Sequence, residues 1–148
     1  MIYQRIFVPV DSSAPSTLAL NEAIRLAKGL GSKLIIAHGV DLPLYGLGNP
    51  EVLDTNVMEQ AQRDAASEIL QAACQHARDA GIEIENVLLE NRGDPIATVV
   101  LNAAHTAKAE LIIMGTHGRS GIMHLLLGSV AEGVLRAADL PVLLVRGE

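Results

Sequence analysis

Glycine and serine are spaced distinctively between residues 115 and 129. Two residues separate Gly115 from Gly118, and nine separate Gly118 from the pair Gly128-Ser129. The stretch follows an apolar run at 111–114 and precedes a helix-like segment, so it predicts a strand-to-helix connection. Backbone N–H groups at such a connection can face an anion, because a helix N-terminus carries partial positive charge. We therefore expect a phosphate-binding loop here.

This spacing differs from the two common nucleotide loops. The sequence has no Gly-x4-Gly-Lys-Ser/Thr, so the lysine and the Mg²⁺-binding hydroxyl of a P-loop are missing, and no Gly-x-Gly-x-x-Gly follows the first strand. The loop therefore favours binding over hydrolysis. The glycines could instead serve a tight turn and close packing, Ser129 and Glu132 could form a capping box, and Arg119 could pair with a phosphate or lie exposed.

Other polar residues offer weaker signals. Asp11 follows the apolar run 6–10 and could accept hydrogen bonds from a ligand or cap the next turn. The histidines His38, His117 and His124 match no compact ligand spacing, so no dedicated transition-metal site is expected. A Mg²⁺ ion brought in by nucleotide phosphates is the more plausible metal. Cys74 is expected to be a small buried apolar residue.

Alternating strands and helices must position these residues. Short apolar runs predict five strands, at residues 6–10, 33–40, 82–89, 111–114 and 142–145. Helices are predicted to begin near Pro15, near Thr55, at Asp94-Pro95 with Asp94 as N-cap, and just after Gly128. On the long second helix, the predicted inward face comprises Ala61, Ala65, Ile69, Ala72, Ala73, His76 and Ala80.

This alternation predicts an α/β fold, a doubly wound five-stranded parallel sheet of Rossmann-like type with four helices. The flavodoxin-like order 3-2-1-4-5 would put the third strand at an edge and the switch point between strands one and four. Asp11 and Gly115 follow those two strands. They would then converge on one crevice, where such sheets bind ligands.

Length and composition limit the possible functions. The chain of 148 residues fits one domain, 1–148, and is 49% hydrophobic with a formal net charge of -6. Few aromatic residues and an acidic balance argue against a nucleic-acid partner. No apolar run is long enough to span a membrane, and no signal peptide is visible. The single cysteine fits a reducing compartment, so a cytoplasmic location is expected.

The sequence resembles the universal stress protein family over essentially its whole length. The carrying features are Val8-Pro9-Val10-Asp11-Ser12-Ser13, Ala37-His38-Gly39-Val40, Gly93-Asp94-Pro95 and, above all, the Gly115…Gly118…Gly128-Ser129 spacing. That spacing is the family's ATP-binding signature, whereas the other features only support it. The resemblance implies a homodimer paired partly through the terminal strand, and ATP bound with little hydrolysis.

The resemblance also implies site residues. Asp11 looks like the acid that contacts adenosine, Gly39 offers its backbone to adenine, Gly115 lies against the ribose, and the later glycines and Ser129 line the phosphates. The implied ATP-binding set is Pro9, Val10, Asp11, Gly39, Met114, Gly115, His117, Gly118, Arg119, Gly128, Ser129 and Val130. Gly39 replaces a bulkier aliphatic residue, so a wider or looser adenine pocket is expected.

The function expected from these features is an ATP-binding stress-response switch or sensor. It would be non-enzymatic, with no catalytic residues, and would act on an unknown protein partner. The segment 41–50, rich in proline and glycine, is expected to be a mobile loop that signals the bound state. Homodimer pairing is expected through Val142–Val145. The alternatives are a slow ATPase, or a dimeric protein-interaction module with a vestigial nucleotide pocket.

Overall fold

A computed structural model describes residues 2–42, 55–117 and 127–147 of the chain. Its elements alternate from strand to helix along the sequence, as a doubly wound fold requires. They are β1 (Arg5–Pro9), α1 (Ala14–Leu30), β2 (Lys33–Asp41), α2 (Thr55–Asp79), β3 (Ile84–Asn91), α3 (Ile96–Thr106), β4 (Leu111–Gly115), α4 (Ser129–Ala137) and β5 (Val142–Val145).

The strands form one parallel sheet in the order β3-β2-β1-β4-β5. This confirms the predicted order, with β3 at an edge. Ile6 of the central strand pairs with Leu34 of β2 on one side and with Leu111 of β4 on the other. Because strand order reverses between β1 and β4, the chain segments that leave these strands separate toward opposite faces of the sheet. A crevice at their carboxyl ends is the expected result.

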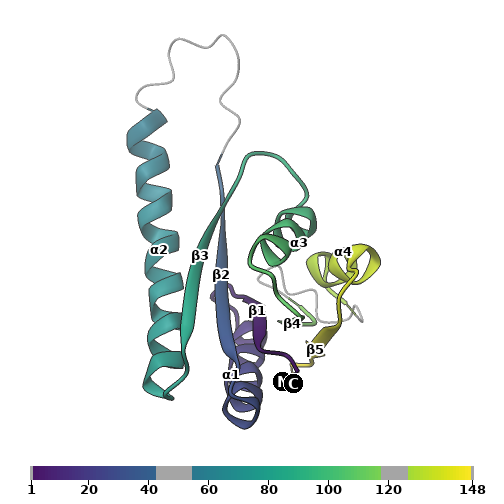
Figure 1. Cartoon of the computed structure of the whole chain (residues 1–148). Coiled ribbons are helices and arrows are strands. Elements are labelled where there is room, and N and C mark those ends of the chain that lie inside the picture. Colours follow the sequence, from purple (N-terminus) through teal and green to yellow (C-terminus); the bar gives the residue numbers. More distant parts are fainter. Residues whose placement is uncertain (1, 43–54, 118–126, 148) are drawn as a thin grey trace.

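Helices cover both faces of the sheet, with α1 and α2 on one side and α3 and α4 on the other (Figure 1). Side chains that alternate along each strand serve the two faces in turn, so Ile6 packs toward α1 and α2 whereas Phe7 packs toward α3 and α4. Both side chains are fully buried. Burial on both faces explains why the strands read as continuous apolar runs rather than as alternating ones.

Helix α1 begins and ends as its sequence predicts. The Ser13 hydroxyl caps its N-terminus by accepting the Ser16 N–H, and Pro15 lies in the first turn. Gly31 ends the helix with φ of 72°, where its N–H donates to the Ala27 carbonyl. These bonds place Asp11 and Ser16 on either side of a fixed helix start.

Three local predictions are wrong. The third strand is Ile84–Asn91 rather than 82–89. Helix α3 is capped at Pro95, because the Asn91 side chain accepts the Asp94 N–H and draws Asp94 into the preceding turn. Helix α4 has Gly128 as its N-cap, and Ser129 is already helical with no capping bond. Glu132, the other half of the possible capping box, instead accepts a hydrogen bond from Arg136 at 2.6 Å.

The inward face of α2 also differs from the prediction. Its buried residues are Glu59, Ala66, Leu70, Cys74 and Ala77, whereas Ala61, Ala65, Ala72 and His76 are exposed. Alanine occurs all round this helix, so the larger Leu70 decides which stripe faces the sheet. Cys74 is fully buried, as predicted, and burial raises the pKa of its thiol.

The predicted mobile segment 41–50 falls largely outside the described residues. Asp41 ends β2, and Leu42, which follows it, is 2% exposed. Residues 43–50 lie outside the described part of the chain. Among the described helices, none has the length and apolarity that crossing a bilayer would require.

Candidate functional site

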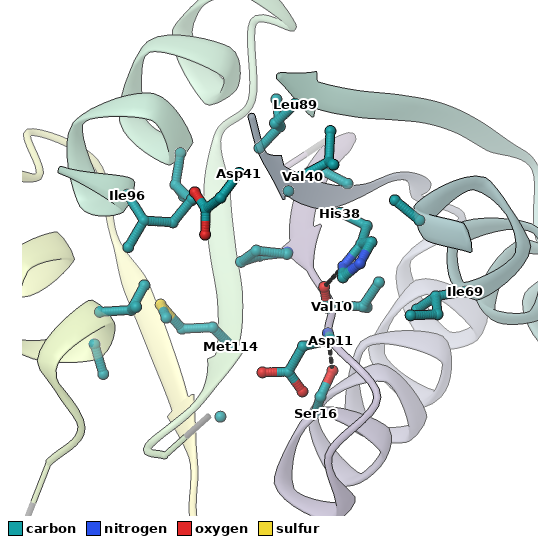
Figure 2. A pocket seen from close by; sticks show the side chains of 18 of the residues that line it. Val10, Asp11, Ser16, His38, Val40, Asp41, Ile69, Leu89, Ile96 and Met114 are labelled. Atoms are coloured by element: carbon teal, nitrogen blue, oxygen red, sulfur yellow. Dashed lines mark hydrogen bonds between the residues drawn. The ribbon is translucent and has the colours of Figure 1, made fainter. Parts of the chain in front are cut away.

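A cavity of about 660 Å³ lies at the carboxyl ends of β1, β2 and β4. Its walls come from both layers, with Ala66 and Ile69 of α2 on one side and Ile96 and Val100 of α3 on the other. Figure 2 shows Asp11 and His38 on the α1 and α2 side, across from Ile96 and Met114. The cavity therefore occupies the predicted crevice and reaches around the strand ends to both faces of the sheet.

Most of the site residues predicted from the sequence meet in this cavity. Those that line it are Pro9, Val10, Asp11, Gly39, Met114, Gly115, His117, Ser129 and Val130. Gly118 and Arg119 lie outside the described residues. Gly128 is not a lining residue, and its N–H donates to the Thr116 carbonyl at 2.6 Å. That N–H is thus engaged in closing the chain onto β4.

Asp11 is held by hydrogen bonds on several sides. Its N–H donates to the Ser16 hydroxyl at 2.8 Å, and its Oδ1 accepts the Ser13 N–H at 2.8 Å. One carboxylate oxygen therefore closes the turn, as one of the two readings of Asp11 expects, and the residue also lines the cavity. Among the described residues, no hydrogen bond is recorded for Oδ2, so this oxygen can accept from a ligand.

His38 supports the same turn from β2. Its ring is 8% exposed, and Nδ1 lies 2.7 Å from the Val10 carbonyl (Figure 2). A carbonyl can only accept, so Nδ1 carries the proton, and in the neutral ring Nε2 is an acceptor. The sequence pattern singled out His38 only as a possible metal ligand or family motif. Its link to Val10 depends on the strand register and could not be read from spacing.

Gly39 faces the opposite layer, where Ile96 occupies the space that a side chain would take. A Cβ at this position would come within 3.2 Å of the Ile96 Cδ1 atom. The Ile96 side chain thus packs directly over Gly39. Together with Val100 and Met114, Ile96 forms an apolar wall suited to a flat ring.

Gly115 is required by close backbone approach. A Cβ there would meet the Pro15 carbonyl oxygen at 3.1 Å and the His117 carbonyl oxygen at 3.3 Å. Beyond Gly115, the Thr116 N–H donates to Val145 and the Thr116 hydroxyl lies 3.1 Å from His117 Nδ1. The packing reading of this glycine is therefore correct, and it brings the end of β4 against the start of α1.

The N-terminus of α4 opens on the cavity through Ser129 and Val130. The first N–H groups of a helix have no partner within that helix, and they favour anions. Ser129 makes no capping bond, which leaves its exposed hydroxyl available at the same place. No Lys or Arg is found among the described residues that line the cavity. A bound anion would therefore rely on the helix start and on residues outside the described set.

Two acidic residues lie at or near the part of the cavity formed by the end of β2. Asp41 lines it and accepts a hydrogen bond from the Asn91 amide at 3.1 Å. Farther out, Glu59 is clasped by Arg92 through bonds of 2.8 and 2.9 Å and approached by Arg63 at 3.3 Å. The hydrogen bonds from Arg92 lower the pKa of the Glu59 carboxyl below its usual value. This cluster ties the first turns of α2 to the segment after β3.

The described residues contain no group of three or more His, Cys, Asp or Glu side chains placed to hold a metal ion.

Much of the cavity lining could not be predicted from the sequence. The missed residues include Ser16, His38, Val40, Asp41, Gln62, Ala65, Ala66, Ile69, Ile96 and Val100. The α2 residues among them carry no chemical signal, since only the packing of α2 against the sheet brings them to the cavity.

Known proteins are similar to this chain in sequence and in fold. The model of the universal stress protein family matches residues 2–146. A universal stress protein of Methanocaldococcus jannaschii is 36% identical over 149 residues, covering 98% of this chain and 83% of that protein. A universal stress protein solved in complex with cAMP is 29% identical, with a TM-score of 0.72 and 98% coverage of both chains.

A further solved relative, the universal stress protein from Archaeoglobus fulgidus in complex with dAMP, is 28% identical with a TM-score of 0.66. The match covers 97% of this chain and 98% of the relative. Both solved relatives thus hold adenine nucleotides. Given the family match over nearly the whole length and the shared sheet, this chain belongs to the universal stress protein family.

Proposed function

We propose that this protein binds an adenine nucleotide, with ATP as the expected ligand, and acts as a nucleotide-dependent switch or sensor. The observation that carries the proposal is the pairing of Asp11 with the N-terminus of α4 across one cavity. The first group can accept hydrogen bonds from a nucleoside, and the second favours anions. An apolar wall lies between them. Relatives solved with cAMP and dAMP support this assignment.

Different residues of the cavity would contact the sugar, the base and the phosphates of the ligand. Oδ2 of Asp11 would accept a sugar hydroxyl, while Ile96, Val100 and Met114 would enclose the base. The N–H groups and hydroxyl at Ser129 and Val130 would face the phosphates. The sequence signature adds Gly118 and Arg119 to the phosphate end. A Mg²⁺ ion, if present, would arrive with the phosphates, because hard cations prefer oxygen ligands.

Isothermal titration of ATP into nucleotide-stripped protein tests the proposal. We expect saturable binding, together with a melting temperature that rises with ATP concentration because the ligand binds only the folded state. Asp139→Ala is the control for a substitution in the cavity such as Asp11→Asn, since Asp139 is exposed and does not line the cavity. Wild-type protein that ignores millimolar ATP would contradict the proposal and favour a protein-interaction module.

The same preparation separates binding from catalysis. We expect bound ATP to be recovered intact after hours at 25 °C, because the sequence lacks a P-loop lysine. Phosphate release that disappears in Asp11→Asn but persists in the control variant would identify a slow ATPase instead. Phosphate release that is equal in both variants would point to a contaminant.

We further propose a homodimer through the free edge of β5. Among the described strands it pairs with β4 alone, and Leu143 is 38% exposed. Unpaired edge strands with apolar side chains need cover, and a second copy of β5 would supply it. Light scattering over a range of concentrations is the test: Leu143→Lys should shift the mass toward the monomer. A wild-type mass that stays monomeric at all concentrations would contradict the dimer.

A further inference from the structure

The peptide between Val10 and Asp11 lies just beyond the end of β1 and is held on both of its edges. The Val10 carbonyl receives the Nδ1–H of His38 at 2.7 Å, and the Asp11 N–H donates to Ser16 at 2.8 Å. The Val10 N–H donates in turn to the Ala37 carbonyl at 2.7 Å. A peptide is planar and rigid, so bonds to its C=O and its N–H fix its rotation about the chain.

That rotation decides where the Asp11 side chain points. The Cα–Cβ bond of Asp11 starts from the fixed peptide, and the bond from Ser13 to Oδ1 then sets the side-chain torsion. Figure 2 shows the resulting carboxylate pointing into the cavity, with Ser16 at the N–H of the peptide and His38 at its carbonyl. Within the described part of the chain, the side chain that hydrogen-bonds to this peptide from another strand of the sheet is that of His38.

We propose that His38 is a positioning residue for ligand binding, which aims Asp11 at the nucleoside through the Val10 carbonyl. The role rests on the proposed nucleotide site. Val10 is 7% exposed, so without His38 its carbonyl would be buried without a partner and the peptide could turn to find one. Asp11 would turn with it.

The ring chemistry makes the proposal selective. The bond to Val10 needs a proton on Nδ1, which is the minor tautomer of a free neutral imidazole. Asparagine can place an amide N–H near the Nδ1 position, whereas leucine fills similar space with no donor. Asparagine should therefore replace the function of His38, and leucine should not.

Titration of ATP into variants of His38 and Asp11 tests this role. We expect His38→Leu to weaken binding about five- to tenfold, the value of one hydrogen bond, and His38→Asn to restore most of that loss. In an Asp11→Asn background, His38→Leu should have little further effect, because its route to the ligand has been removed. His105→Leu is the matched control, since His105 is exposed on α3 and does not line the cavity.

A spectroscopic measurement covers the possibility that His38→Leu folds poorly. Long-range ¹H–¹⁵N spectra of the wild-type histidine rings should assign the Nδ1–H tautomer to His38. An Nε2–H tautomer would overturn the proposal, as would ATP binding unchanged in folded His38→Leu, or an equal loss with and without the Asp11 carboxylate. Wild-type protein that binds no ATP would contradict the proposed function itself, which distinguishes that failure from failure of the His38 role.

Discussion

The two sides of the cavity are built by different means. On the β1 side, hydrogen bonds that involve side chains hold the turn at Asp11: its carboxylate accepts the Ser13 N–H, the Ser16 hydroxyl accepts the Asp11 N–H, and the His38 ring donates to the Val10 carbonyl. On the β4 side, missing side chains allow close approach: Gly115 lies against Pro15, and Gly133 of α4 would meet Ala97 of α3 at 2.7 Å through an added Cβ. One side is fixed by polar bonds and the other by steric fit.

Because of this difference, we expect substitutions on the two sides to have different effects on ligand binding and on stability. Asp11 is only partly buried, so its side chain can lose one polar group at modest cost to folding, since water can replace part of the bond. A close backbone or helix contact cannot accept an extra carbon without displacing whole elements. Substitutions on the β1 side should therefore act on the ligand, and those on the β4 side on the fold as well.

Gly133→Val should have the largest effect on stability. The added branches would force α3 and α4 apart, because the Ala97 Cβ already occupies the space. We expect a loss of about 1–3 kcal/mol in the free energy of unfolding, measured by urea denaturation. The control is Gly29→Val, since a Cβ at Gly29 of α1 meets nothing within 4 Å. Equal losses in the two variants would show that steric fit between α3 and α4 is not the cause.

Asp11→Asn should show the opposite behaviour. Asparagine keeps an oxygen for the Ser13 N–H but removes the charge that faces the ligand. We expect ATP affinity to fall about ten- to hundredfold, the range for a hydrogen bond to a charged group. The free energy of unfolding without ligand should change by less than about 0.5 kcal/mol. Lower stability with unaltered affinity would reverse the comparison between the two sides.

Gly115→Ala should affect both properties. Its Cβ would press on the carbonyl groups of Pro15 and His117, which are backbone atoms and cannot swing away. We expect about 1 kcal/mol of destabilisation, at the lower end of the range for overpacking, together with weaker ATP binding. Melting curves and titrations on the same samples check this. An alanine that alters affinity alone would mean that Gly115 serves the ligand and not the packing.

Glu59→Gln should have the smallest effect at the site, and its signature is the pH dependence of stability. The Arg92 bonds lower the pKa of Glu59 below its ordinary value of 4.5, so ionised Glu59 stabilises the fold above that pH. The stabilisation is lost as pH falls through the depressed pKa. We expect Glu59→Gln to be less stable at pH 7, with the difference shrinking in denaturation series below pH 4.5. A difference that persists at low pH would point to lost packing instead.

Much of the fold could be predicted because its signals are local. The apolar runs, the Ser13 cap and the Gly31 stop each act within a few residues, and strand alternation with helices leaves few topologies. The failures occurred where a distant or competing partner decides. Asn91 captures Asp94 before it can cap α3, and Gly128 bonds to Thr116, so Ser129 enters the helix uncapped.

The same contrast between local signals and distant partners applies to the candidate site. Residues at strand ends, such as Asp11 and Met114, could be predicted to converge because parallel strands end at one edge of the sheet. The α2 wall could not be predicted, since its alanines carry no periodic preference. Nor could Ile96 be assigned to the space above Gly39, because that contact joins β2 to a helix far along the chain.

Cys74 gives this chain a native reporter of its own motions. It is the single cysteine in the sequence, it lies fully buried on the face of α2 that packs on the sheet, and burial raises the pKa of its thiol. A thiol reagent at neutral pH can reach it only when α2 lifts away from the sheet. The labelling rate therefore measures how often the α2 wall of the cavity opens, without any engineered probe.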